Sequence, residues 1–542
     1  TRAAELLLLK LNGQWDSRLE LLCNATFYCA ATAGLGWMLA TWLGRRSWPL
    51  IWVIFALDLA LPFAWENTLW AFQNQFYFLI VFSLLTMGLL GLSRPLSRWW
   101  WLGTVAGIGA FFSMATGFVA AAVAGAMSLS RVCKGKEKWQ PHLATWVVCG
   151  GLVLGGLYFR INVPGHEQAQ SHSFVEFLRA LGKGLAWPCV LWAWYAPVAL
   201  APVCVVVWRR LRSAETFRRP ELFLFGTAGW VVLHALASAY ARGIGGGPPA
   251  WRYMDYLSLL AVVNCLSLYL LHEEKQASRR FKMWLRAGTA IWTAGCITGL
   301  CYLTWQVQHR FLPEIALEQA VRQASARAFM ATDDPGVFLN EPVTNRPVPN
   351  PEADVWIFRN PYLRPIFPVC FREPLHVAPA TNSDDSFVPH GWLLSEADAP
   401  TERSWGSYSG KKEAARGIFE SLPIQAGTLP YLVVPVAGDL GRPGLSLKLV
   451  EVNTGREISV TPSEIAHGEW LNVVVRAPSG PFKLVARDES ETGWFAFKEP
   501  IEMGRFSLWT VRVLATWEAL VIIGAGLFVL NLVRWRKQDR DA

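Results

Sequence analysis

WWWLGTVAGIGAFFSMATGFVAAAVAGAMSLS, residues 99–130, is the stretch that decides the fold. Its 32 residues carry no charge and lie between two basic loops, residues 94–98 and 131–142. Basic loops beside apolar spans stay in the cytoplasm, so the stretch must cross a membrane an even number of times. Two helices of about 16 residues reach only about 24 Å each, against a hydrocarbon core of about 30 Å. We therefore predict a short or re-entrant hairpin that turns at residues 112–117, FSMATG.

The whole chain of 542 residues has the composition of a membrane protein. Hydrophobic residues make up 53% of it and charged residues only 17%, and it holds 29 Trp and 30 Phe. This composition excludes a disordered protein, a collagen and a small disulfide scaffold. Nine further apolar stretches predict membrane helices at residues 22–43, 49–65, 76–93, 143–159, 187–208, 222–241, 256–271, 287–306 and 510–533.

Positive charge is concentrated in six short loops, which hold 22 Lys and Arg in 59 residues. The short stretches on the opposite side hold 8 in 77. The positive-inside rule places the basic loops in the cytoplasm, so the net charge of +9 needs no nucleic-acid partner. Counting the hairpin as two, we expect eleven crossings, with residue 1 outside and Ala542 inside. The basic loops are residues 44–48, 94–98, 131–142, 209–221, 272–286 and 534–542.

The predicted fold is a polytopic α-helical membrane bundle with an extracytoplasmic antiparallel β-sandwich. Residues 1–306 form the helical membrane domain, and residues 307–405 an outer helix and a Pro-rich linker. Residues 406–505 form the sandwich, because short runs such as LSLKLVEV and FKLVARDE alternate apolar and polar residues between turns. Residues 510–533 form a C-terminal transmembrane helix.

The chain opens at Thr1 on an amphipathic stretch, and we expect at least one earlier span and its loop to precede it. Nine of the ten cysteines lie in or beside apolar spans or in basic loops, and no CxxC or Cys/His pair has zinc spacing. We therefore expect no metal site and no cofactor.

The outer loop AWENTLWAFQNQF, residues 64–76, sets Glu66, Asn67 and Gln73 among aromatic residues. On a helix Glu66, Trp70 and Gln73 would share one face. A carboxylate beside amides at the mouth of a bundle suits orientation of a sugar, or general-base catalysis. The alternative is a polar turn in an aromatic belt. Asp58, in the middle of a predicted span, should face a cavity or a partner, or else make a structural hydrogen bond.

A second outer stretch, YARGIGGGPPAWRYMDY, residues 240–256, brackets a Gly/Pro-rich turn with Arg242 and Arg252. A guanidinium at headgroup level suits a phosphate or diphosphate, and the glycines would let backbone amides approach the same anion. The alternative is a pair of interfacial anchors that flank a turn.

Two further outer segments have competing interpretations. Residues 160–188 contain His166, Glu167 and His172, but their spacing favours an interfacial amphipathic helix over a zinc site. In the sandwich, aromatic residues suit either carbohydrate binding or core packing, and we favour packing. These aromatic residues are Trp405, Tyr408, Trp470 and Trp494.

The layout resembles the GT-C class of polyprenyl-phosphate-sugar glycosyltransferases. The resemblance covers residues 20–306 by architecture, with WENTLWAFQNQF and GPPAWRYMD as local motifs, and the sandwich resembles accessory carbohydrate-binding modules of such enzymes. It implies transfer of a sugar from a polyprenyl-phosphate donor to a glycan or protein acceptor, outside a bacterial-type inner membrane. Arg252 with Arg242 would hold the lipid phosphate, and Tyr253, Asn67 and Gln73 would help to bind substrate.

In that class an acidic residue of the first outer loop deprotonates the acceptor, and direct displacement inverts the anomeric centre. That loop would precede Thr1, so Glu66 is the substitute candidate for the base and Asp58 the second catalytic candidate. Two other functions stay open. A carrier or flippase of a lipid-linked glycan would move its substrate without forming a glycosidic bond, and a non-enzymatic envelope assembly protein would hold a partner through its sandwich.

Overall fold

The apolar stretch that decides the fold forms a helical hairpin in the computed structural model. Helices α6 (Arg98–Ser113) and α7 (Val119–Cys133) flank a turn in which Gly117 N donates to Met114 O over 2.8 Å. The predicted turn at residues 112–117 is confirmed. The structure describes residues 2–135, 137–159, 166–213, 215–274, 278–342, 346, 350–382, 387–389, 403–408, 416–425 and 427–540, with only the backbone of His166 and residues 531–540.

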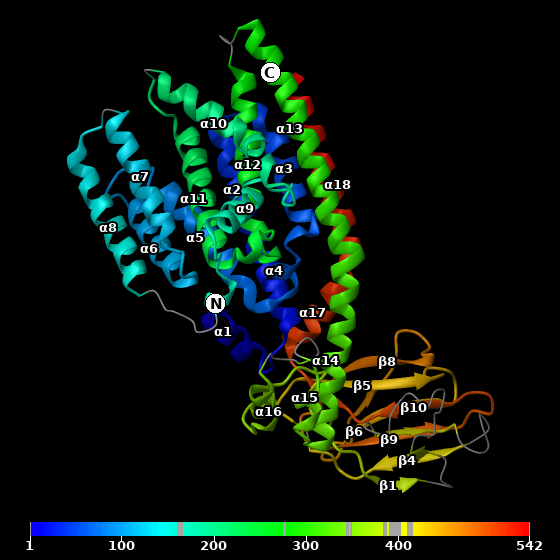
Figure 1. The fold of residues 1–542 in the computed structure, drawn as a ribbon. Coiled ribbons are helices and arrows are strands. Elements are labelled where there is room, and N and C mark those ends of the chain that lie inside the picture. The colour runs from blue at the N-terminus through cyan, green and yellow to red at the C-terminus, as the bar shows by residue number, and fades with distance from the viewer. Residues whose placement is uncertain are drawn as a thin grey trace. The chain divides into compact units, whose positions relative to one another are not determined.

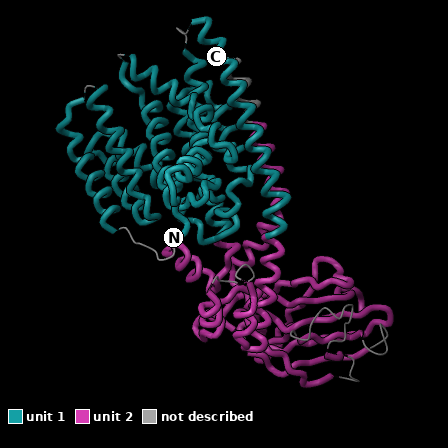
Figure 2. The backbone as a smooth tube through the Cα atoms, viewed as in Figure 1, with its two compact units in different colours: residues 1, 21–314 teal, residues 2–20, 315–542 magenta. Residues whose placement is uncertain are grey.

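Two compact units make up the described chain, residues 21–314 and residues 2–20 with 315–542 (Figure 2). The first unit is helical throughout (Figure 1). Besides α6 and α7, its α-helices are α2 (Ser17–Leu43), α3 (Trp48–Ala60), α4 (Trp65–Leu69), α5 (Asn74–Leu85), α8 (Trp139–Tyr158), α9 (Phe174–Leu185), α10 (Ala196–Arg212), α11 (Arg219–Arg242), α12 (Met254–Glu273) and α13 (Arg279–Gln306).

By length and composition, five helices among the described residues can cross a membrane, or six if the bent pair α17 (Arg505–Ala515) and α18 (Trp517–Arg540) counts as one span. The chain is therefore a mostly helical membrane protein with a sheet domain. The eleven crossings and their orientation stay predictions. One predicted span, residues 187–208, begins late: residues 187–195 form turns and a 3-10 helix, and α10 starts only at Ala196.

Close helix contact depends on glycine at the hairpin. A Cβ built on Gly117 would lie 1.7 Å from the carbonyl oxygen of Ala110, and one on Gly103 of α6 would lie 2.3 Å from the backbone nitrogen of Leu90. Leu90 ends the π-helical turn η4 (Thr86–Leu90). These contacts are between backbones, so no side-chain rotation can relieve them.

We expect Gly117→Ala to destabilise the protein by about 1–3 kcal/mol, because the added methyl group forces the hairpin apart. Gly150→Ala is the matched control, since nothing lies within 4 Å of its Cβ position in α8, and helix propensity favours alanine there by up to about 1 kcal/mol. Thermal unfolding of the detergent-solubilised protein, followed by tryptophan fluorescence, measures both. Equal midpoints for the two variants would contradict the packing argument.

The second unit holds an antiparallel β-sandwich. One sheet has the order β1-β4-β9-β6-β7, and the other β11-β5-β10-β3-β2, with β8 also paired to β5. The strands are β1 (Pro379–Asn382), β2 (Val388–Pro389), β3 (Ser404–Gly406), β4 (Gly417–Ser421), β5 (Tyr431–Gly438), β6 (Leu445–Glu451), β7 (Glu457–Ser459), β8 (His467–Arg476), β9 (Phe482–Asp488), β10 (Phe495–Lys498) and β11 (Ile501–Met503).

Both sheets bury one face in a shared core. Phe419 and Leu447 come from one sheet, Val434 and Phe497 from the other, and all four are at most 1% exposed. The two alternating runs quoted from the sequence are strands β6 and β9, whose successive residues alternate between buried and less buried positions as predicted. Strands β1 and β2 also belong to the sandwich, although they precede its predicted start at residue 406. They were not predicted because their short segments carry no alternating pattern.

The N-terminal segment belongs to this unit. Helix α1 (Arg2–Asn12) ends at Asn12, whose Oδ1 accepts from Phe506 N and Ser507 N at the start of α17. Gln14 Oε1 accepts from Gly504 N over 3.0 Å, and its Nε2 donates to Phe367 O over 2.9 Å. The remaining helices of this unit are α14 (Leu312–Thr332), α15 (Gly336–Leu339) and α16 (Pro351–Arg359).

Candidate functional site

The loop at residues 64–76 and the Arg-Tyr element at residues 252–253 meet in the helical unit. Glu66 lies in the first turn of α4, and Arg252 lies in η8 (Trp251–Tyr253), the short 3-10 helix that leads into α12. Arg252 N donates to Glu66 Oε2 over 3.3 Å, and Arg252 Nη1 lies 3.7 Å from the same oxygen. The carboxylate side chain is 12% exposed and the guanidinium side chain 31%. The two charged groups are therefore far apart for an ion pair, and the arginine is the more exposed of the two.

Asn67 joins these two segments. Its Nδ2 donates to Arg252 O over 2.8 Å and to Asp255 Oδ2 over 2.7 Å, and its side chain is completely buried. Asp255 stands in the first turn of α12, where a carboxylate interacts favourably with the helix dipole. One amide thus fixes the backbone next to Arg252 and the start of α12, so the position of Arg252 does not depend on its own ion pair.

Asp58 of α3 also lies near the start of α12. The Ser258 hydroxyl group donates to Asp255 O over 2.9 Å, and Asp58 is near enough to Asp255 to interact electrostatically. Asp255 and Ser258 are three positions apart and therefore share a face of α12. Tyr28 of α2 stacks on Tyr77 with ring centroids 4.3 Å apart. The role of Asp58 stays a prediction.

Several buried amide oxygens in this loop have no hydrogen-bond partner among the described residues. They are Asn67 Oδ1, Gln73 Oε1 and Asn74 Oδ1, on side chains that are at most 3% exposed. Three acceptors left unpaired within eight positions are unusual, because an unsatisfied buried polar group costs about 1–3 kcal/mol. Hydroxyl groups are the donors that such oxygens would take.

The prediction that Glu66, Trp70 and Gln73 share a helix face is wrong. Trp70 has φ −108° and ψ 103°, an extended conformation that ends α4. Gln73 then lies in a separate 3-10 helix, η3 (Ala71–Gln73). Helix α4 has only five residues and ends before this break. Asn24 of α2 stabilises the turn that follows by donating to Ala71 O over 3.1 Å.

The glycine-rich turn after α11 does not contribute as predicted. Gly245 N donates to Glu176 Oε2 of α9 over 3.2 Å, and Lys183 Nζ donates to Gly246 O over 2.8 Å. Gly246 has φ +64°, and a Cβ there would lie 2.8 Å from Arg179 Cβ. The turn is glycine-rich because it packs on α9, and a side-chain carboxylate already occupies its Gly245 amide. Arg242 ends α11 and is half-buried, and its role in substrate binding stays a prediction.

Tyr253 lies among aromatic residues next to Arg252. The Tyr253 ring lies 5.5 Å from the guanidinium carbon of Arg252 and contacts Phe76 and Tyr256. Asp255 was missed as a site residue, although its position three residues after Arg252 was a usable signal. Helix α9 lies inside the segment 160–188 that was predicted to be outside, and residues 160–165 of that segment fall outside the described part. No group of three His, Cys, Asp or Glu residues with metal-binding geometry occurs among the described residues.

Comparison with known proteins adds little to this geometry. The chain matches no protein-family model, and no curated protein matches it. Among solved structures, the chain matches the cryo-EM structure of the arabinosyltransferase EmbB from Mycobacterium smegmatis. The match has a TM-score of 0.29 and 14% sequence identity, and it covers 90% of this chain and 57% of the other. Because the score is below 0.5, we draw neither fold nor activity from it.

Proposed function

We propose that this protein is a membrane glycosyltransferase that moves a sugar from a polyprenyl-phosphate donor to an acceptor hydroxyl on the extracytoplasmic face. The observation that carries the proposal is the contact between Glu66 and Arg252, two charged residues far apart in the chain that meet beside a membrane span. Ionisable residues that face the interior of a membrane bundle are rare and usually serve a function.

Arg252 is suited to the donor phosphate. Its guanidinium group is about one-third exposed and sits 3.7 Å from Glu66, too far for a strong direct hydrogen bond. It can therefore turn to a phosphate, to which arginine makes two parallel charged hydrogen bonds. Because Asn67 holds the backbone of residue 252, the side chain can change partner without loosening α12.

Glu66 is suited to the acceptor. Once Arg252 pairs with the donor phosphate, the carboxylate loses its counter-ion and becomes the better base. Glu66 takes the proton from the acceptor hydroxyl, and the oxygen attacks the anomeric carbon. The bond between that carbon and the phosphate oxygen breaks, and the electron pair leaves with the polyprenyl phosphate, whose charge Arg252 stabilises. The anomeric centre is inverted. The unpaired oxygens of Asn67, Gln73 and Asn74 are buried, so sugar hydroxyls would reach them only after this loop moves.

The experiment is lipid binding and product analysis with the full chain in proteoliposomes. A short-chain polyprenyl phosphate should raise the thermal midpoint of the protein. Arg252→Ala should weaken its binding by about tenfold or more, since a hydrogen bond to a charged group contributes about 1.5–3 kcal/mol. Arg310→Ala should leave binding unchanged. The Arg310 side chain is 64% exposed and pairs with Glu314, four positions along the chain.

A panel of polyprenyl-phosphate sugars with a hydroxyl acceptor then separates the rival functions. A new glycosidic bond, detected by mass spectrometry, supports transfer. Movement of the donor across the bilayer without any new bond would instead identify a carrier. Equal lipid-phosphate binding by wild type and Arg252→Ala would remove the assigned role of Arg252.

A further inference from the structure

Helix α17 connects the last strand of the sandwich to the C-terminal helix α18. The predicted C-terminal span, residues 510–533, is broken at Thr516, and the axes of α17 and α18 are bent by 63° from one another. Membrane spans tilt from the bilayer normal by only about 20° on average. Where α18 spans a bilayer, α17 therefore turns away from the normal and towards the membrane plane.

One face of α17 packs on the sandwich. Leu508 belongs to a buried cluster with Val433 of β5 and Met503 of β11. Ser507 and Thr510 of the helix are buried as well. This packing fixes which face of α17 the sandwich covers, and therefore which side chains are left outside.

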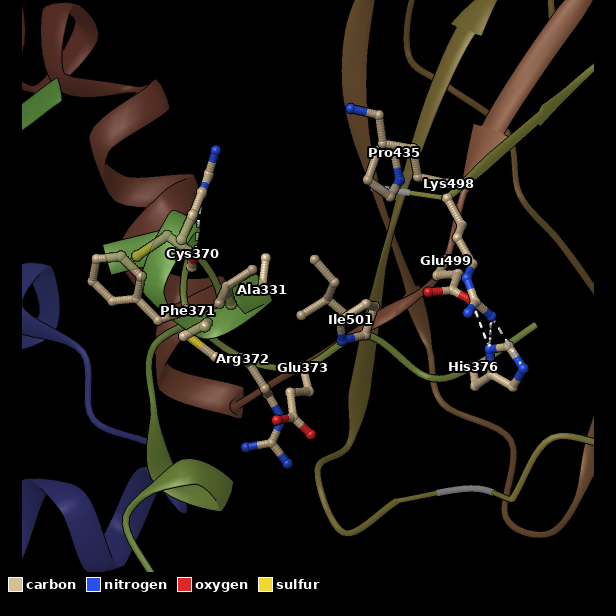
Figure 3. Close-up of a pocket in the computed structure, with 15 residues that line it drawn as sticks. Ala331, Cys370, Phe371, Arg372, Glu373, His376, Pro435, Lys498, Glu499 and Ile501 are labelled. Atoms are coloured by element: carbon tan, nitrogen blue, oxygen red, sulfur yellow. Dashed lines mark hydrogen bonds and ion pairs between the residues drawn. The ribbon is translucent and has the colours of Figure 1, made fainter. Parts of the chain in front are cut away.

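Strand β11, which leads directly into α17, is itself fixed to the rest of the unit. Ile501 of β11 lines a pocket of about 540 Å³ together with segment 369–374 (Figure 3). Arg372 of this segment pairs with the next residue of the strand, Glu502, and both side chains are buried. The sandwich therefore sets the orientation of α17.

The part of α17 that the sandwich leaves uncovered is also apolar. Phe506 and Trp509 are three positions apart, so they share a face of the helix, and both are exposed. Leu514 and Trp517, at and beyond the end of the helix, are exposed too. A helix whose outer face meets water normally carries polar residues there. The outer face of α17 is thus suited to an apolar environment.

Helix α1 adds to this apolar surface. Asn12 at its end donates through Nδ2 to Ser507 Oγ over 2.9 Å, in addition to the bonds that its Oδ1 accepts from the start of α17. The two helices are therefore joined. The exposed apolar residues of the α1 segment are Leu6, Leu7, Leu11 and Trp15. Extensive exposed apolar surface marks sites of protein or membrane interaction.

Basic side chains accompany the exposed apolar ones. The two helices contain four basic residues and one acidic residue, Glu5. The basic residues are Arg2, Lys10, Arg505 and Arg512, and none of them forms an ion pair within the described part of the chain. Helices that lie in the headgroup region of a bilayer combine Trp, Phe and Leu with Lys and Arg in this way, and the cations attract anionic lipids.

We propose that α1 and α17 form a lipid-binding surface that lies in the headgroup region of the bilayer and holds the β-sandwich at the membrane. The apolar side chains enter the acyl boundary, and the basic side chains contact anionic headgroups. The bilayer is the occupant that the chain itself favours, because the apolar helix α18 begins two residues after α17 ends. The surface does not depend on the proposed transfer reaction, and its test needs no activity.

The test is photo-crosslinking of the full chain in proteoliposomes made of equal parts of phosphatidylcholine and phosphatidylglycerol. Photoreactive p-benzoylphenylalanine in place of Trp509 should give lipid adducts, detected by mass spectrometry. The same residue in place of Leu422 is the matched control. Leu422 is 51% exposed against 50% for Trp509, but it follows β4 in the other sheet of the sandwich, and it should give no lipid adduct above background.

The lipid composition of the adducts tests the role of the basic residues. Phosphatidylglycerol should exceed its share of the bilayer among the adducts at position 509. Arg505→Gln combined with Arg512→Gln should remove this excess, because the amides carry no charge. Adducts that keep the excess in this variant would overturn the contact between these arginines and anionic headgroups.

The crosslinked partner distinguishes the lipid bilayer from the other occupants. A crosslink from position 509 to a second copy of the chain would make this surface a dimer interface, and a crosslink to the helical unit would make it an internal contact. Either result, or equal lipid yields at positions 509 and 422, would overturn the proposal. An unchanged thermal midpoint shows that the labelled protein is folded. The same photoreactive residue in place of Phe506 repeats the test if the variant at Trp509 unfolds.

Discussion

Glutamine in place of Glu66 should lower the rate of sugar transfer by about 10²- to 10⁴-fold, the usual contribution of a general base. The amide cannot accept the proton of the acceptor hydroxyl, but it has nearly the same shape and can still accept the Arg252 backbone hydrogen bond. We therefore expect the loss to appear in kcat. Steady-state kinetics of the full chain with a polyprenyl-phosphate sugar would measure it.

The same substitution should leave binding of polyprenyl phosphate intact or make it tighter. Glu66 competes with the lipid phosphate for Arg252, and glutamine removes that competing charge. A base that also binds the cation thus predicts opposite changes in rate and affinity. A purely structural pair predicts that stability, affinity and rate fall together.

Two controls complete this prediction. Glu66→Asp shortens the side chain but keeps the carboxylate, so it should restore part of the rate that glutamine loses. Glu314→Gln removes an exposed carboxylate of the same unit, 59% exposed, and should leave both constants unchanged. If Glu66→Gln retains the wild-type kcat, then another group must be the base, and Asp58 would be the next candidate.

Much of the fold could be predicted because it follows from local patterns. The hairpin turn at residues 112–117 follows from the charge-free length between two basic loops, and strands β6 and β9 follow from their alternation. Each pattern lies within a few dozen residues of sequence. Periodicity and charge therefore sufficed to place most helices and the central strands.

The pairings of buried polar groups could not be predicted from the sequence. Asn67 bonds to residues 185 and 188 positions away, and no local pattern says which amide meets which carboxylate. The hydrogen bond between Gln14 and Gly504 links residues 490 positions apart, and no sequence pattern predicts it either. Beside the extended Trp70, Ala71 O accepts from Asn24, 47 positions earlier in the chain. The local sequence does not show such a contact, and a helical face through Glu66 and Gln73 was therefore expected in error.

Alanine in place of Glu502 should destabilise the second unit by about 3–5 kcal/mol, the usual cost of breaking a buried ion pair. Glu502 pairs with Arg372, and both side chains are less than 10% exposed. Glu502 Oε1 also accepts from Leu429 N over 3.1 Å. Alanine leaves a buried guanidinium group without its counter-charge and a buried amide without its acceptor. Since domains are stable by only about 5–15 kcal/mol, the effect is large.

Chemical denaturation of the full chain, together with hydrogen exchange of residues 427–508, would measure this loss. Glu457→Ala provides the contrast, because its pair with Lys448 is exposed and such pairs contribute at most about 1 kcal/mol. The double variant Arg372→Met with Glu502→Leu should be more stable than Glu502→Ala, since it removes both charges and fills their space. If the double variant were the less stable of the two, specific hydrogen bonds rather than the uncompensated charge would hold this part of the protein together.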